Sequence, residues 1–137
     1  MEKYYIDTSI WIDLYDDRKG YNNEPLGEFA LKLFYFIRTN KHKLIISDVL
    51  IKELETGYTR AEINGMIKPF EDIIEKIRIS EKQKEEADKI AKEKNLPPGD
   101  VSHAILSRDN KFILISRDND FKELKDISKY YKPEEII

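Results

Sequence analysis

Short apolar runs alternate along the chain with longer amphipathic stretches, which is the pattern of strands separated by helices. The clearest strands are predicted at residues 3–6, 43–46 and 112–115, with shorter or weaker ones at 76–80 and 127–131. Helical spacing of apolar residues predicts helices at 8–14, 26–40, 48–57, 59–75, 81–94 and 100–110, and a helical turn at 122–126. The fourth of these helices is expected to bend or break at Pro69, because proline cannot continue a helical hydrogen-bond ladder.

This alternation predicts the fold class. Strands joined through helices need crossover connections, so the sheet should be parallel. Crossovers are right-handed, which places helices on both faces of the sheet. We therefore expect residues 1–137 to form a single α/β domain, a three-layer α/β/α arrangement around a central parallel sheet of four to five strands. Ligands of such sheets bind beyond the carboxyl ends of the strands, so the residues after each strand are the candidates for chemistry.

Composition narrows the class of protein. A chain of 137 residues suits one domain, and the absence of cysteine rules out disulfides and thiolate metal sites. The net charge of −3 gives no basic footprint for nucleic acid, although a local basic rim remains compatible with it. There is no membrane-length apolar run and no basic region leading into an apolar one. We expect a cytoplasmic protein without membrane association.

Carboxylates stand close to the ends of several predicted strands. Asp7 follows the first strand, Glu53 lies in the helix after the second, and Asp100 opens the helix before the apolar strand at 112–115. Asp118 and Asp120 follow that strand. Close carboxylates resist ionising together unless a cation lies between them. Oxygen ligands without cysteine suit Mg²⁺ or Mn²⁺, so the pattern points to a metal site for phosphoryl chemistry.

Each of these acids also has a simpler explanation. Asp7 and Asp100 would both serve equally well as helix N-caps. Asp118 and Asp120 fit a polar turn, and Glu53 fits the solvated edge of a helix. Taken singly, none of these positions distinguishes a ligand from a structural residue.

We predict structural roles for the remaining polar residues. We expect Glu55 to point outward and Ser47 or Asp48 to cap the helix that follows, with Thr8 or Ser9 capping the first helix and leaving Asp7 free. Solvated positions are expected for the other acids, Asp13, Asp16, Asp17 and Asp109. His42 should lie at the surface. His103 lies on nearly the same helix face as Asp100, so it can touch either the site or the core, with a structural role favoured.

Three stretches together resemble the PIN-domain nuclease family. They are "YYIDTSIWIDL", "LIISDVLIKELETG" and "PPGDVSHAILSRDNKFILISRDNDF", and their order along the chain agrees with that family. The size and motif order are most similar to the VapC-like toxin ribonucleases of type II toxin–antitoxin systems. The match spans almost the whole chain, and the ordered set is more specific than any one motif.

The resemblance assigns roles by position. It implies that Asp7, Glu53, Asp100 and Asp118 are the four catalytic acids, and that Asp120 is a further acid present in many members. The metal ligands would then be Asp7, Asp100, Asp118 and Asp120. Two small hydroxyl residues would support the site, Ser9 and Ser116. Ser116 stands where threonine is more usual.

The same resemblance implies an activity and partners. The expected protein is a Mg²⁺- or Mn²⁺-dependent endoribonuclease whose products carry 5′-phosphate and 3′-hydroxyl ends. Its partners would be RNA, a small antitoxin protein and a second copy in a homodimer. Candidate contacts to the RNA backbone are Arg18, Lys19, Lys52 and Arg117. The alternatives are a stand-alone PIN nuclease of RNA processing and a catalytically silent PIN-like scaffold.

The helix at 26–40 carries more aromatic residues than one core face needs. Phe29, Leu33, Tyr35 and Phe36 can form a homodimer or antitoxin surface, or belong to an ordinary core.

Overall fold

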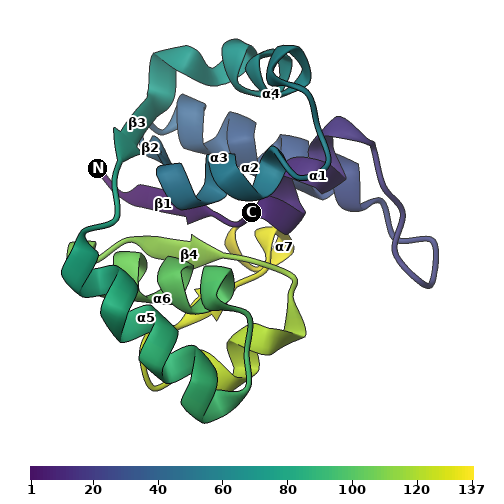
Figure 1. Ribbon diagram of the computed structural model, residues 1–137. Helices are drawn as coiled ribbons and strands as arrows, with labels where there is room; N and C mark the ends of the chain where they lie inside the picture. The colour runs from purple at the N-terminus through teal and green to yellow at the C-terminus, as the bar shows by residue number, and fades with distance from the viewer.

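A five-stranded parallel sheet with the strand order β3-β2-β1-β4-β5 organises the computed structural model, which describes residues 1–137 (Figure 1). The strands are β1 (Lys3–Ile6), β2 (Lys43–Ser47), β3 (Ile74–Ile77), β4 (Ile113–Ile115) and β5 (Tyr130–Tyr131). The helices are α1 (Thr8–Tyr15), α2 (Leu26–Thr39), α3 (Asp48–Leu54), α4 (Arg60–Ile67), α5 (Glu81–Lys94), α6 (Pro98–Asn110) and α7 (Pro133–Ile136), with 3₁₀ segments η1 (Lys68–Ile73) and η2 (Asn119–Leu124). The predicted α/β class and parallel sheet are confirmed.

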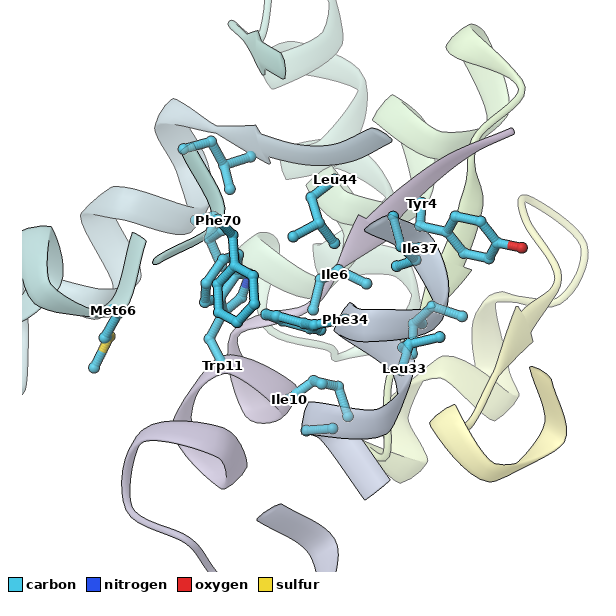
Figure 2. Close-up of a cluster of buried hydrophobic side chains, with 14 of the residues drawn as sticks. Tyr4, Ile6, Ile10, Trp11, Leu33, Phe34, Ile37, Leu44, Met66 and Phe70 are labelled. Carbon is cyan, nitrogen blue, oxygen red and sulfur yellow. The ribbon is translucent and has the colours of Figure 1, made fainter. Parts of the chain in front are cut away.

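Helices cover both faces of this sheet because successive strand residues point to opposite sides. In β1, Tyr4 and Ile6 join the apolar cluster under α1, α2, α3 and α4, whereas Tyr5 joins the cluster under α5 and α6. Figure 2 shows the first cluster, in which Trp11 and Phe34 meet edge to face with ring centroids 4.8 Å apart. The two clusters form the three-layer arrangement that the sequence predicted.

Several element boundaries differ from the sequence prediction, and one helix was missed. The helix predicted at 59–75 ends as α4 at Ile67, the 3₁₀ segment η1 follows around Pro69, and residues 74–75 belong to β3. The predicted break at Pro69 is therefore confirmed, whereas the predicted strand at 127–131 is reduced to β5.

Helix α6 begins at Pro98 with Pro97 at its N-cap position, so Asp100 lies within the first turn and the N-cap reading is wrong. Strand β3 ends at Ile77 rather than reaching Ser80, because its only partner strand, β2, ends at Ser47, the residue paired with Ile77. Beyond it, the N–H of Ile79 donates to Asp48 Oδ1. Helix α7 was not predicted; it packs against α2.

The aromatic helix α2 belongs mainly to the core. Leu33 is fully buried, and Phe29 and Phe36 are half-buried. Only Tyr35 among the four expected surface residues is exposed, at 52%. No helix of the structure is both long and apolar enough to cross a membrane.

Candidate metal centre

The site lies where β1, β2 and β4 end, at the carboxyl edge of the sheet. Strand β1 is central and pairs with β2 on one side and β4 on the other. Asp7 follows β1, and its N–H donates to the carbonyl of Ile115 at the end of β4 (3.0 Å). Because parallel strands end at the same edge, the residues after β4 lie beside Asp7.

Asp7 is 3% exposed, and its two carboxylate oxygens have different surroundings. Oδ2 accepts hydrogen bonds from Ser9 Oγ (2.7 Å), Ser116 Oγ (2.9 Å) and the N–H of Ser9 (3.3 Å). Oδ1 accepts none from within the chain and lies 3.6 Å from His103 Nε2. Asp7 is itself the N-cap of α1, so the expectation that Thr8 or Ser9 would replace it as the cap is wrong. One oxygen holds the helix start, and the other is free for a ligand.

Glu53 projects from α3 toward the same edge. Its Oε1 accepts hydrogen bonds from Thr8 Oγ1 and from His103 Nε2, each 2.6 Å long, while Oε2 accepts none. Burial by itself raises the pKa of Glu53, but the bond and charge of His103 outweigh burial and lower the pKa overall. Glu53 is therefore a carboxylate held in a fixed direction, and the alternative that it lies at the solvated edge of a helix is wrong.

His103 is fully buried between the site and the core. Its Nδ1 lies 2.5 Å from the hydroxyl of Tyr5, which lies 2.6 Å from Ser47 Oγ. Burial disfavours the imidazolium, yet the hydrogen bond to Glu53 and the nearby acids outweigh burial and raise the pKa of His103. The residue serves both roles that the sequence left open, since it contacts Glu53 on one side and Tyr5 on the other.

The first turn of α6 approaches Glu53 closely at Gly99. A Cβ atom at this position would overlap Oε2 of Glu53. Glycine is required here for the close approach of two elements rather than for an unusual backbone angle, because its φ is not positive. The contact brings Asp100, the next residue, to the site.

Asp100, Asp118 and Asp120 form a second group in which one oxygen of each lies within 4.8 Å of the others. None of the three takes part in an ion pair with a basic side chain. Burial, the charge of Asp118, a shared hydrogen bond with Asp120 and the charge of Asp7 raise the pKa of Asp100 to about 8. Burial, followed by the charges of Asp120 and Asp7, also raises the pKa of Asp118.

Ser116 connects this group to Asp7. Its hydroxyl donates to Asp7 Oδ2 and accepts the N–H of Asp118 (3.0 Å), and Asp118 Oδ1 in turn accepts the N–H of Asp120 (2.9 Å). This chain of bonds fixes the turn after β4 relative to the end of β1. The hydroxyls of Ser9 and Ser116 together hold Oδ2 of Asp7 in place.

The residues present fit a divalent cation. Uncompensated carboxylates that resist ionising together are the donor set that Mg²⁺ and Mn²⁺ prefer. Asp7, Glu53 and His103 form another group whose ligand atoms lie within 4.8 Å of one another. His103 already bonds through both ring nitrogens, so we assign it to orienting Glu53 rather than to binding a metal.

Asp13 is the one acid whose expected place is wrong. It is 1% exposed rather than solvated, and it pairs with Arg18 (2.8 Å) and Arg117 (3.4 Å). Arg117 also forms a bidentate pair with Glu134 of α7. These two arginines, expected as RNA contacts, are held by acids of the chain itself.

The other polar predictions have simpler outcomes. Glu55 is exposed, as expected, and Asp16, Asp17 and Asp109 lie at the surface. The cap of α3 is Ser47, whose Oγ accepts the N–H of Leu50 (3.1 Å), whereas Asp48 accepts from Ile79. His42 is half-buried rather than a surface residue, and its Nδ1 accepts the N–H of Glu2.

Comparison with known proteins supports the interpretation of this edge. The family model of the PIN domain matches residues 4–127. The chain belongs to the PIN-domain family. No match was found among curated proteins.

Solved structures agree in fold. A VapBC2 complex from Rickettsia felis bound to a promoter DNA fragment is similar with a TM-score of 0.68 and 17% identity, over 95% of this chain and 98% of that one. A toxin–antitoxin complex from Klebsiella pneumoniae has a TM-score of 0.64 and 19% identity, covering 94% and 96%. PAE2754 from Pyrobaculum aerophilum has a TM-score of 0.59 and 16% identity, covering 98% and 93%. Identities this low establish the common fold alone. Membership of the PIN family, together with the acidic edge, supports a nuclease function.

Proposed function

We propose that this PIN-domain protein, with residues 1–137 as one domain, is a Mg²⁺- or Mn²⁺-dependent endoribonuclease. The observation that carries the proposal is the convergence of five acids, Asp7, Glu53, Asp100, Asp118 and Asp120, at one edge of the sheet without basic partners apart from His103. A set of this kind costs folding free energy unless a cation binds it, so a purely structural role does not explain it.

The chain supplies a fixed arrangement of ligands. Ser9 and Ser116 hold Oδ2 of Asp7 and leave Oδ1 free, while the turn after β4 presents Asp118 and Asp120 toward Asp100. Asp7, Asp100, Asp118 and Asp120 are the residues that would hold the metal. When bound, such an ion lowers the pKa of a water molecule and offsets charge on phosphodiester oxygens.

Glu53 would act beside these ligands. Thr8 and His103 fix its Oε1, so its unpartnered Oε2 has a defined direction and can accept a proton or orient a water molecule. The buried chain from His103 through Tyr5 to Ser47 keeps the imidazole in place. The acid and its supports are thus fixed before substrate arrives.

A toxin role with an antitoxin partner is part of the proposal. It is supported by family membership and by the similarity to a VapBC2 complex and a toxin–antitoxin complex. A homodimer is proposed as well, with exposed Tyr35 on α2 as a candidate contact. A stand-alone nuclease of RNA processing remains the alternative. Co-expression with the product of the neighbouring gene, followed by co-purification, tests for an antitoxin.

RNA cleavage by the purified protein tests the activity. We expect structured and single-stranded RNA to be cut with Mg²⁺ or Mn²⁺, and the cleavage to stop with EDTA. Asp7→Asn and Asp100→Asn should each lower the rate at least a hundredfold. Cleavage that persists in EDTA or in both variants would refute the proposed mechanism.

Calorimetry separates this proposal from a silent PIN-like scaffold. The wild type should bind Mn²⁺ with an affinity that a variant lacking Asp7, Asp100, Asp118 and Asp120 does not show. Equal and weak heats for the two proteins would favour the scaffold.

A further inference from the structure

The arginines of this chain divide into two groups. Four of the six form ion pairs with acids of the chain, namely Arg18, Arg38, Arg108 and Arg117. Arg60 and Arg78 form none and are exposed. An unpaired guanidinium retains its full set of donors for an external anion.

Both free arginines line the same groove, although they come from different elements. The groove has a volume of about 1250 Å³ and lies between α3, α4, the end of β3 and the first turn of α6. Figure 1 shows α4 as the outer helix of this region, above α3 and β3. Three lysines line it as well, Lys52, Lys76 and Lys84.

Acids neutralise this basic lining only in part. Asp48, Glu53 and Glu55 also line the groove. Oδ1 of Asp48 accepts the N–H groups of Ile79 and Val49, and Glu53 belongs to the acidic site. Lys84 is paired with Glu81 (3.4 Å), whereas Arg60 and Arg78 have no acidic partner. In a chain with a net charge of −3, five basic residues around one groove form a local basic footprint.

The groove leads to the candidate metal centre. Glu53 and Gly99 are part of its lining, and Gly99 precedes Asp100. Its volume exceeds the range of roughly 300–1000 Å³ that small-molecule pockets occupy, which suits a segment of a polymer. Isoleucines of α3 and α4 provide an apolar wall beside the charges, which can shield one face of an unstacked base from water.

We propose that this groove binds the sugar–phosphate backbone of a single-stranded RNA segment beside the scissile bond, with Arg60 and Arg78 contacting phosphates. The inference rests on the proposed function and adds the path of the substrate to it. Arginine forks match phosphate oxygens bidentately, and the lysines add charge along the strand. An acidic peptide would meet the same arginines, but only a nucleic acid strand would also present a phosphodiester to the acids where the groove reaches Glu53.

Fluorescence anisotropy with a labelled single-stranded RNA oligonucleotide, in EDTA at several salt concentrations, tests the proposal. Arg60→Ala/Arg78→Ala should weaken binding at least tenfold and reduce the salt slope by about 1.4, since each phosphate contact with a single strand contributes roughly 0.7. The RNA affinity of Arg60→Lys/Arg78→Lys should lie between those of the wild type and the alanine variant, because lysine keeps the charge but loses the bidentate guanidinium contact.

The matched control is Lys89→Ala/Lys92→Ala on α5. Both lysines are exposed, form no ion pair and lie outside the groove, and the change removes the same charge. This variant should bind RNA within about twofold of the wild type. Thermal unfolding by circular dichroism checks that all variants are folded, as expected for exposed positions.

Parallel cleavage with Mg²⁺ separates this inference from the proposed function. If the wild type binds and cuts RNA and the arginine-to-alanine variant behaves identically, the groove does not bind the substrate, and the proposed nuclease function stands. A wild type that neither binds nor cuts RNA overturns both. Competition by poly-glutamate as strong as by RNA of equal charge, or a changed sedimentation state of the variant, would assign the groove to a protein partner instead.

Discussion

At the scale of residues, the site depends on carboxylates whose two oxygens have separate tasks. Asp7 uses Oδ2 to cap α1 and to accept from Ser116, and leaves Oδ1 for a ligand. Glu53 fixes Oε1 through Thr8 and His103 and leaves Oε2 free. The choice between cap and ligand, which the sequence left open for Asp7, is therefore not exclusive.

His103→Gln should affect both stability and the site. The imidazole is fully buried and joins Glu53 to Tyr5, and glutamine cannot keep both bonds in the same geometry. We expect a loss of about 1–3 kcal/mol in the free energy of unfolding by urea. The rate of RNA cleavage with Mg²⁺ should fall roughly 10–100-fold, because Glu53 loses the hydrogen bond that directs its Oε2.

The control for this change is His42→Gln, at a half-buried histidine near the N-terminus and away from the acids. It should leave the rate of RNA cleavage unchanged. If His103→Gln loses stability but cleaves RNA at the wild-type rate, the histidine supports the core alone.

Gly99→Ala should weaken metal binding, because the first turn of α6, which carries the ligand Asp100, can no longer approach Glu53 as closely. The added Cβ would overlap Oε2, and the side chain of Glu53 can move only by giving up its present direction. Gly65→Ala is the comparison, because nothing lies within 4 Å of a Cβ there and the residue is inside α4. It should raise the free energy of unfolding by about 0.5–1 kcal/mol and leave Mn²⁺ affinity unchanged. Equal Mn²⁺ affinity in the two variants would contradict the role of the close approach.

At the scale of elements, α7 is tied to the site through Arg117. This arginine precedes Asp118, lies over the ring of Phe29 and forms the bidentate pair with Glu134. Through Asp13 the same arginine contacts α1. The turn that carries two of the acids is thus anchored from its outer side.

Glu134→Gln tests this anchor through its pH dependence. Burial raises the pKa of Glu134, but the bond to Arg117 outweighs burial and lowers the pKa overall. A lowered pKa in the folded state means that the stabilisation is present above the unfolded value of about 4.3 and is lost as pH falls through the folded value. The pair is partly exposed, so we expect the wild type to exceed the variant by about 0.5–1 kcal/mol at pH 7.

Urea unfolding at pH 7 and pH 3 measures this difference, which should be smaller at the lower pH. Glu123→Gln, at an exposed acid without an ion pair, should show no difference at either pH. A difference for Glu134→Gln that is equal at both pH values would mean that the ion pair does not contribute.

The sequence predicted most elements of the fold because their apolar periodicity is strong, as in α2 and β1. Weak elements were missed or displaced for identifiable reasons. Helix α7 has only four residues, and β3 ends early because its partner strand β2 gives way to α3 at Asp48. Asp13 was misplaced because a buried ion pair depends on Arg117, which is distant in sequence and adjacent only in the fold.

At the scale of the whole molecule, strand order decides the site. A parallel sheet was predictable from alternating strands and helices, but nothing local to the chain shows that β1 lies between β2 and β4. That order brings Asp7, Glu53 and Asp118 to one edge. The candidate acids could be proposed from the ordered motifs of the family. The role of His103 in orienting Glu53 became visible only in the folded structure.

The most direct measurement of the central claim is a crystal structure of the protein soaked in Mn²⁺, with the ion located by its anomalous scattering. We predict a strong peak between Asp7 and Asp100, coordinated by Oδ1 of Asp7 and by the group of Asp100, Asp118 and Asp120. The peak should be absent from crystals of Asp7→Asn/Asp100→Asn soaked in the same way. No peak at this edge in the wild type, or an unchanged peak in the variant, would contradict a metal centre built from these acids.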